Sequence, residues 1–394
     1  MGGEAASISA RASAWLERQL PSPATAVIIF DDSLIAGDRD GNLVCWQQDG
    51  DECWRCELSN RVGAMAVSNG RVFVTAGRDV VAIDLASGEV VWTAELDGSS
   101  DMVGCNSDSG IVVATSSVYD IEVNDFLESA IWRFTVDGEL VRSDILDERP
   151  WSLEVRTDGR AMLGIGRPRC GMLRADEEGL HWSALPSEAP ITCGLTDRER
   201  TVLGHADGVL TVIEDGIVLD ESPFNTQPGS IEALACLSNG LLVALRRDKG
   251  VAGSGFGGGN GITRALTSEG NLLWEHELPE GVVVENVCEG PKFGDISTSW
   301  TSIWDGSDGR ILIFDSVDGS AIGELLEGSR VNAMASCSPN SEKIALALED
   351  GAVLLFEGEM LTRRLQHPGT ESGESEGDED KSALAQRLRA LRDR

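Results

Sequence analysis

Apolar positions alternate with polar or small ones along nearly the whole chain, in short runs that end at Asp-Gly, Asn-Gly or Ser-Gly. A period of two is typical of β-strands, because successive side chains point to opposite faces, and these dipeptides form tight turns. Apolar spacing of the helical kind appears only near the two ends. The pattern therefore predicts an all-β protein with short N- and C-terminal helices.

A turn glycine recurs at a spacing of roughly 44 residues, which lies in the range of a four-stranded propeller blade. The markers are Gly50, Gly88, Gly138, Gly179, Gly216, Gly270, Gly319 and Gly358. In four repeats a tryptophan follows closely, and these are Trp54, Trp92, Trp182 and Trp274. The repeats predict one eight-bladed β-propeller over residues 24–366, or seven blades if segment 289–308 is irregular. The expected blades are 24–58, 62–96, 101–145, 150–185, 189–222, 230–278, 281–326 and 330–366.

The repeat "DVVAIDLASGEVVWTAEL" places Ala82, Asp84, Ser87, Gly88 and Trp92 in the pattern A-x-D-x-x-[ST]-G-x-x-x-W. It resembles the repeats of quinoprotein propellers, which carry pyrroloquinoline quinone. The last repeat is similar to a WD-type repeat without its terminal Trp-Asp pair. The resemblance implies a β-propeller of the WD-repeat and quinoprotein-like superfamily. We expect the tryptophan to cover a neighbouring blade and Asp84 and Ser87 to hydrogen-bond the turn.

The chemistry of the quinoprotein enzymes is not expected here. Those enzymes carry an adjacent cysteine pair over their cofactor, and no Cys-Cys occurs in this chain. The motif "CWRC" (53–56) lies on an expected strand, where positions three apart point to opposite faces. The glycine-rich segment 250–261 precedes strands rather than the helix of a nucleotide site, and the four histidines lack metal-ligand spacing. We therefore expect no cofactor, no metal and no catalysis. Five cysteines near the ends of inner strands are interpreted as small buried apolar residues: Cys105, Cys193, Cys236, Cys288 and Cys337.

Charge narrows the possible partners. The formal net charge is −34, with 66 acidic and 32 Lys or Arg residues, which disfavours nucleic acid and anionic membrane surfaces. Either a salt-rich host or a basic partner explains this acidity. No continuous apolar stretch is typical of an export signal or a membrane span, so we expect a cytoplasmic protein.

Strand order places the b–c and d–a connections of all blades on one face of the disc, here called the b–c face. Its two long insertions are 118–128 and 250–261, and loops on a rigid scaffold often carry function. Basic residues near the b–c connections suggest a contact for an acidic peptide or an anion: Arg39, Arg78, Arg167, Arg169, Arg246, Arg247 and Lys249. The alternative is that each arginine pairs with a neighbouring carboxylate such as Asp40, Asp79 or Asp248.

The termini form further modules. Residues 1–23 are expected to hold an amphipathic helix with Ile8, Ala12, Trp15 and Leu16 on one stripe, packed on the propeller or engaging a partner. Residues 367–380 are an acidic linker by composition. Residues 381–394 are expected to form a basic docking helix, which binds either in a groove of a partner or on the acidic disc. Its expected contact positions are Leu384, Arg387, Leu388 and Leu391.

Together these features favour a non-catalytic scaffold for protein–protein interaction, a monomeric propeller within a complex. The alternative is a propeller enzyme, or a protein that binds a small ligand or an anion in the central channel or on the b–c face. Convergent polar residues of inner strands at a pocket would favour the alternative. A channel lined by small apolar residues and cysteines would favour the scaffold.

Overall fold

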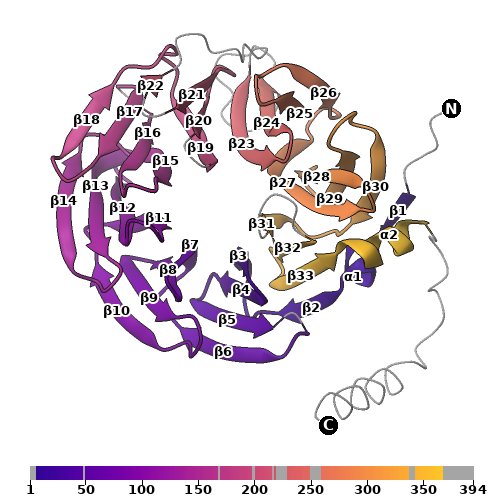
Figure 1. Cartoon of the computed structure of the whole chain (residues 1–394), viewed down its shortest axis with the longest axis horizontal. Helices are drawn as coiled ribbons and strands as arrows, with labels where there is room; N and C mark the ends of the chain where they lie inside the picture. Colours follow the sequence, from indigo (N-terminus) through magenta and orange to yellow (C-terminus); the bar gives the residue numbers. More distant parts are fainter. Residues whose placement is uncertain are drawn as a thin grey trace.

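The computed structural model describes residues 6–47, 49–166, 169–197, 200–214, 217–218, 229–248, 259–336 and 342–366. Eight mainly antiparallel sheets follow one another around a common axis (Figure 1). The innermost strands are β3, β7, β11, β15, β19, β23, β27 and β31. The expected eight-bladed β-propeller is confirmed. In segment 289–308 strands β27 and β28 pair with each other, with one local register shift between Gly290 and Phe293, and this pairing excludes the seven-bladed alternative.

Within each blade the strands a to d run from the axis outwards. Blades 1 to 4 are β3–β6 (Ala24–Phe30, Ser33–Asp38, Asn42–Gln47, Glu52–Glu57), β7–β10 (Val62–Ser68, Arg71–Ala76, Asp79–Asp84, Val90–Glu95), β11–β14 (Ser99–Asn106, Ile111–Asp120, Asp125–Thr135, Leu140–Leu146) and β15–β18 (Pro150–Val155, Ala161–Ile165, Gly171–Ala175, Leu180–Ser183). Blades 5 to 7 are β19–β22 (Ile191–Asp197, Arg200–His205, Leu210–Glu214, Ile217–Val218), β23–β26 (Ser230–Leu237, Gly240–Asp248, Gly259–Thr267, Leu272–Glu277) and β27–β30 (Val283–Phe293, Ile296–Trp304, Gly309–Asp315, Ala321–Leu326). Blade 8 contains β31–β33 (Val331–Ser336, Lys343–Leu348, Ala352–Glu357).

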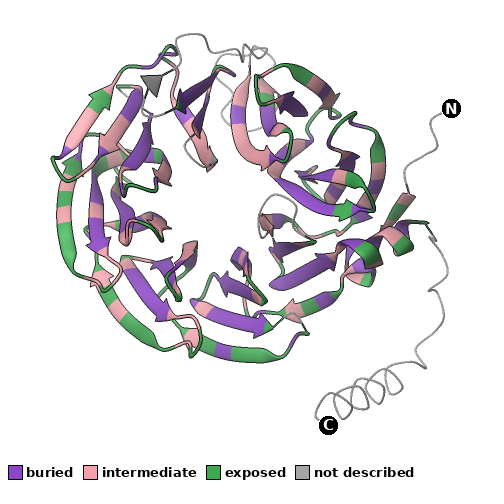
Figure 2. Cartoon of the chain, in the orientation of Figure 1, coloured by how far each residue is buried: buried purple, intermediate pink, exposed green. Residues whose placement is uncertain are grey.

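The core lies between neighbouring blades. Strands b and c are sandwiched on both faces, so β4, β8 and β32 are buried at every residue after the first. Outer strands such as β10 have one wet face and alternate between exposed and half-buried residues (Figure 2). This explains why the inner runs are continuously apolar while the outer strands keep a period of two.

Tryptophans of the outer strands lock three blades to the next. The indole N–H of Trp54 donates to the Leu85 carbonyl at 2.8 Å, that of Trp92 to Val136 at 2.9 Å and that of Trp274 to Ser316 at 3.1 Å. Each ring covers the turn glycine of the following blade: a Cβ at Gly88, Gly138 or Gly319 would lie within 2.6 Å of it.

The turn that Trp54 covers is held as the repeat predicts. The Asp84 carboxylate accepts hydrogen bonds from the backbone and hydroxyl of Ser87, each 2.9 Å long, and these bonds lower the pKa of Asp84. The expected role of the tryptophan and of the turn residues is therefore confirmed in this repeat.

The N-terminal segment closes the ring, and the expected amphipathic helix over it is wrong. Strand β1 (Ala6–Ser9) pairs in parallel with β30, only Ala10–Ser13 (α1) are helical, and β2 (Leu16–Gln19) pairs with β33 as strand d of blade 8. The N-terminal segment forms strands rather than a helix because the three-stranded sheet β31–β33 would otherwise expose a row of unpaired N–H and C=O groups. Leu16 and Leu20 are buried by this pairing.

The end of the last repeat also differs from expectation. Helix α2 (Gly358–Gln366) stands where the repeat predicts strand d, so blade 8 does not extend to residue 366. The Glu357 carboxylate accepts the N–H groups of Glu359 and Met360 at the start of this helix, and Leu361 and Leu365 are buried. Residues 367–394, with the predicted linker and docking helix, lie outside the described residues. Among the helices that the structure describes, none has the length and apolar character needed to cross a membrane.

Candidate functional site

A β-bulge opens the inner strand of every blade at the same place on the b–c face. Each a–b strand pair loses register near the start of strand a, where one extra residue is inserted. A bulge re-aims side chains and is frequent beside functional sites. The bulged positions form a ring around the axis: Thr25, Gly63 with Ala64, Asp101, Trp151, Thr192, Glu232, Glu285 and Asn332.

Several members of the ring bind the next blade. Thr25 donates its hydroxyl to the carbonyl of Val62 at 2.6 Å, and the amide of Asn332 donates to the carbonyl of Ala24 at 2.8 Å, across the closure of the ring. Asn286, next to a bulge, donates to Val331 at 3.0 Å. These bonds fix neighbouring inner strands relative to one another.

Two cavities lie on this ring. The mouth pocket has a volume of about 320 Å³ and is lined by Glu232, Arg246, Val283, Val284, Glu285, Asn286, Arg330, Val331 and Asn332 of blades 6 to 8. The hairpin groove has a volume of about 860 Å³ and extends over blades 3 to 6. Both are lined by Glu232 and Arg246, so they adjoin at these residues and are together called the depression.

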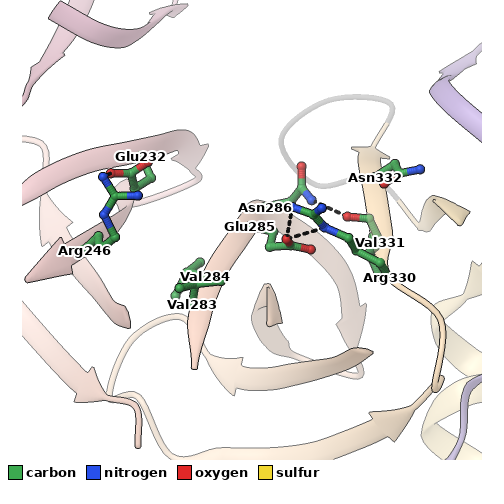
Figure 3. Close-up of a pocket in the computed structure, with 9 residues that line it drawn as sticks. All are labelled: Glu232, Arg246, Val283, Val284, Glu285, Asn286, Arg330, Val331 and Asn332. Atoms are coloured by element: carbon green, nitrogen blue, oxygen red, sulfur yellow. Dashed lines mark hydrogen bonds and ion pairs between the residues drawn. The ribbon is translucent and has the colours of Figure 1, made fainter. Parts of the chain in front are cut away.

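The mouth pocket is polar on both sides (Figure 3). On one side the Arg246 Nη2 atom lies 3.4 Å from Glu232 Oε1, and on the other Arg330 Nε donates to Glu285 Oε1 at 2.6 Å. Two of the bulged positions thus place acidic side chains on facing sides of one pocket. Deeper along the inner strands several half-buried positions are small, namely Ala64, Ala66, Ala233, Ala235, Ala333 and Ala335. The structure therefore combines a polar mouth with inner strands that carry many small apolar residues, together with the half-buried Glu154 of β15.

An apolar hairpin borders the groove. Strands β12 and β13 extend beyond the sheet, and their tip exposes Tyr119, Val123, Leu127 and above all Ile121, which is 85% exposed. Asp120 accepts the N–H groups of residues 122 and 123 and so orders the turn. Exposed apolar residues that gather on one hairpin are more typical of interaction sites than singly scattered ones are.

The hairpin is tied to the next blade by aromatic contacts. The Phe126 ring meets Trp151 edge to face, with centroids 6.4 Å apart. The Arg149 guanidinium lies 4.5 Å from the Phe126 centroid and 4.6 Å from that of Trp151, and it pairs with Asp101 at 3.1 Å. The apolar tip is thus presented on a fixed support.

The predicted basic cluster is spread over four blades and is largely neutralised. Arg39 pairs with Glu349 at 2.8 Å, Arg78 with Glu95 at 3.3 Å and Arg247 with Glu277 at 3.2 Å. Arg246 pairs with Glu232 as described above, and Arg169 lies 3.6 Å above the Trp182 ring. Arg167 and Lys249 lie outside the described residues. The ion-pair alternative describes Arg39, Arg78, Arg246 and Arg247. The partners of Arg39 and Arg78 are not their sequence neighbours Asp40 and Asp79.

The cysteines and histidines offer weaker chemistry. Burial raises the pKa of Cys105 and Cys288 to about 11 and that of Cys193 to about 12. These thiols therefore stay protonated and uncharged at neutral pH, as expected for the side chains of an apolar environment. Cys288 is buried, and Cys105, Cys193 and Cys236 are half-buried. Cys337 lies outside the described residues. Asp176, Glu178 and His181 approach one another on an exposed turn of blade 4. Asp176 already accepts hydrogen bonds from the other two.

The bulge ring is the feature that the sequence reasoning missed. The sequence does contain a signal: when the repeats are aligned, five of them have a polar residue in one column near the start of strand a, in "TAVI", "TCGL", "EALA", "ENVC" and "NAMA". Alternation alone hides this column, because a bulge interrupts the period of two.

These features define an eight-bladed β-propeller with a polar mouth and an apolar hairpin on one face. Residues 11–123 match the family model described as outer membrane protein assembly factor BamB. No curated protein sequence matches the chain. In its repeat pattern and fold the chain is thus similar to the WD-repeat and quinoprotein-like β-propellers.

Solved structures agree with this fold at low sequence identity. The computationally designed Ika8 protein is 16% identical with a TM-score of 0.64, and the match covers 90% of this chain and 100% of that one. BamB from Moraxella catarrhalis is 14% identical with a TM-score of 0.61, over 87% of this chain and 98% of that one. Sqt1 from Saccharomyces cerevisiae is 12% identical with a TM-score of 0.66, over 88% and 99%.

Proposed function

We propose that this protein is a non-catalytic scaffold of the cytoplasm that holds a protein partner on its b–c face. The observation that carries the proposal is the exposed apolar hairpin of β12 and β13, whose tip residues lie beside a groove of about 860 Å³. Exposing such a tip costs solubility unless a partner covers it. The description of the matched family as an assembly factor supports the same role.

The groove has the composition of a protein interface. Aromatic side chains, here Phe126 and Trp151, are enriched in interface centres, and charged residues form the rim. Asp147, Glu148 and Arg149 supply that rim. The partner therefore contributes apolar residues for the hairpin and polar groups for the rim.

Affinity capture from lysate of the source cells at physiological salt tests this function. The wild type is compared with Ile121→Asp, which places a charge on the tip without touching the core. Ile145→Asp is the matched control, because Ile145 is 81% exposed on outer strand β14 of the same blade. We expect one stoichiometric partner with the wild type and the control, and none with Ile121→Asp.

Two results bear on the details. A partner that is equally retained by Ile121→Asp would refute the b–c face as the contact. A version of the chain ending at Gln366 tests the predicted docking segment 381–394, since loss of the partner from that version alone would move the contact to the C-terminal segment.

A further inference from the structure

The mouth pocket carries more acceptors than the chain itself satisfies. Glu285 is only 9% exposed, and its Oε1 atom accepts the bond from Arg330. Its other oxygen, Oε2, is buried and accepts no hydrogen bond within the described residues. On the facing side, Glu232 Oε1 likewise accepts none, although the Arg246 guanidinium lies 3.4 Å away. A buried carboxylate oxygen without a donor is costly, so each of these atoms favours a ligand that brings N–H groups.

The pocket offers further acceptors of the same kind. The side-chain amide of Asn286 donates to Ser302 and to the Val331 carbonyl, and that of Asn332 donates to Ala24 and Glu349. With their N–H₂ groups engaged, the two asparagines can offer only their carbonyl oxygens to a ligand.

Carboxylates outnumber arginines along the depression as a whole, while the mouth pocket itself holds two of each. Five carboxylates and three arginines line the two cavities, and each of these arginines is already ion-paired. Asp125, Asp147 and Glu148 are lining carboxylates whose side chains meet no cation in an ion pair among the described residues. The depression thus favours a cation, in agreement with the overall charge of −34.

We propose that the mouth pocket binds an arginine side chain of the protein partner, with its guanidinium between Glu232 and Glu285. A guanidinium presents five N–H donors in a planar fork, which suits acceptors on two sides better than the compact ammonium of lysine. Because the pocket and the hairpin groove share Glu232 and Arg246, a segment docked on the hairpin reaches the mouth without leaving the surface. The inference rests on the proposed function, since it takes the arginine from that partner.

The test uses the full chain and two small probes. Saturation-transfer NMR titrations compare N-acetyl-arginine methylamide with N-acetyl-citrulline methylamide, whose side chain has a neutral urea group in place of the guanidinium. A charge-assisted bond to a buried group is worth about 1.5–3 kcal/mol. We therefore expect the citrulline probe to bind at least roughly tenfold more weakly. Equal binding of the two probes, or tighter binding of the corresponding lysine probe, overturns the proposal.

Paired variants locate the site. Glu232→Gln with Glu285→Gln removes two charges at the mouth, and Glu139→Gln with Glu178→Gln removes two exposed charges from c–d turns on the opposite face. We expect only the mouth variant to weaken arginine binding, by roughly tenfold or more, and equal weakening by both variants refutes the site. If the mouth variant does not fold, as judged by circular dichroism, the comparison of probes on the wild type decides.

The outcomes separate this inference from the proposed function. A partner lost with Ile121→Asp but retained by the mouth variant leaves the scaffold standing and removes the arginine site. Selective binding of the arginine probe without any captured protein removes the scaffold, and the pocket is then a site for a free guanidinium compound.

Discussion

The tryptophan of the outer strand provides the sharpest test of how this ring is held together, because the same repeat position has two different environments. Trp54 is 7% exposed and bonded to blade 2, whereas Trp182 is 37% exposed and lies under Arg169. A buried tryptophan removes about 200 Å² from water, worth about 5 kcal/mol at 25 cal/mol per Å². Relaxation around the cavity reduces the loss, so Trp54→Ala is expected to cost about 3–5 kcal/mol.

The exposed equivalent should behave differently. Trp182→Ala loses chiefly a cation–π contact, worth about 0.5–1 kcal/mol at exposed sites. Trp54→Phe retains an aromatic ring, although a smaller one, but leaves the Leu85 carbonyl without its donor, which costs about 1–3 kcal/mol.

Urea unfolding followed by far-ultraviolet circular dichroism measures these differences as midpoint shifts at constant slope. If Trp182→Ala moves the midpoint as far as Trp54→Ala, contact between blades does not explain the repeat tryptophan.

Three further perturbations address the turns, the closure and the channel wall. Gly319→Ala is expected to destabilise the protein more than Gly281→Ala in the same urea assay. Both glycines have positive φ, 73° and 83°, but only at Gly319 would the new Cβ meet Trp274, at 2.5 Å. Equal losses of stability would mean that backbone strain is the whole effect. Leu20→Ala is expected to lower the free energy of unfolding by about 2–5 kcal/mol, because Leu20 is 1% exposed beside the closing strand β2. Trp15→Ala should cost far less, because Trp15 is 52% exposed. The reverse order of the two variants in thermal unfolding would contradict the closure by β2. Desolvation raises the pKa of Glu154, on inner strand β15, to about 7. The folded state therefore binds the proton of this carboxyl group more tightly than the unfolded state does. The stability that this proton contributes is present below the usual pKa of a glutamate and is lost as pH rises through about 7. The stability of Glu154→Gln relative to the wild type should therefore increase between pH 5 and 8. The increase is at most about 3 kcal/mol, since water reaches the half-buried side chain. A difference between the two proteins that does not change with pH would contradict the raised pKa.

The length of the repeat and the strand pattern within it are encoded locally, which is why they are visible in the sequence. A turn glycine with positive φ, such as Gly88 at 74°, is required by the backbone of each turn, and a period of two follows from strand geometry. The interlocking tryptophan is likewise predictable, because it recurs at a fixed distance from that glycine. None of these signals depends on which blades become neighbours at the closure.

Contacts between distant segments could not be predicted in this way. Helical and strand patterns compete in a short segment, and residues 6–19 became mostly strand only because the last blade has an edge to cover. The partner of Arg39 is Glu349, 310 positions away, rather than its sequence neighbour Asp40. Ion pairs are set by proximity in space, so sequence proximity gives little guidance.

The sequence by itself determined the class of the fold, the repeat of about 44 residues and the face with the insertion at 118–128, because each of these depends on short-range geometry that recurs along the chain. Only the tertiary structure decided how the ring closes, where the bulges turn Glu232 and Glu285 towards one pocket, and which apolar residues of the hairpin stay exposed. Those features arise from the packing of one blade against the next, and that packing brings together residues that the chain holds far apart.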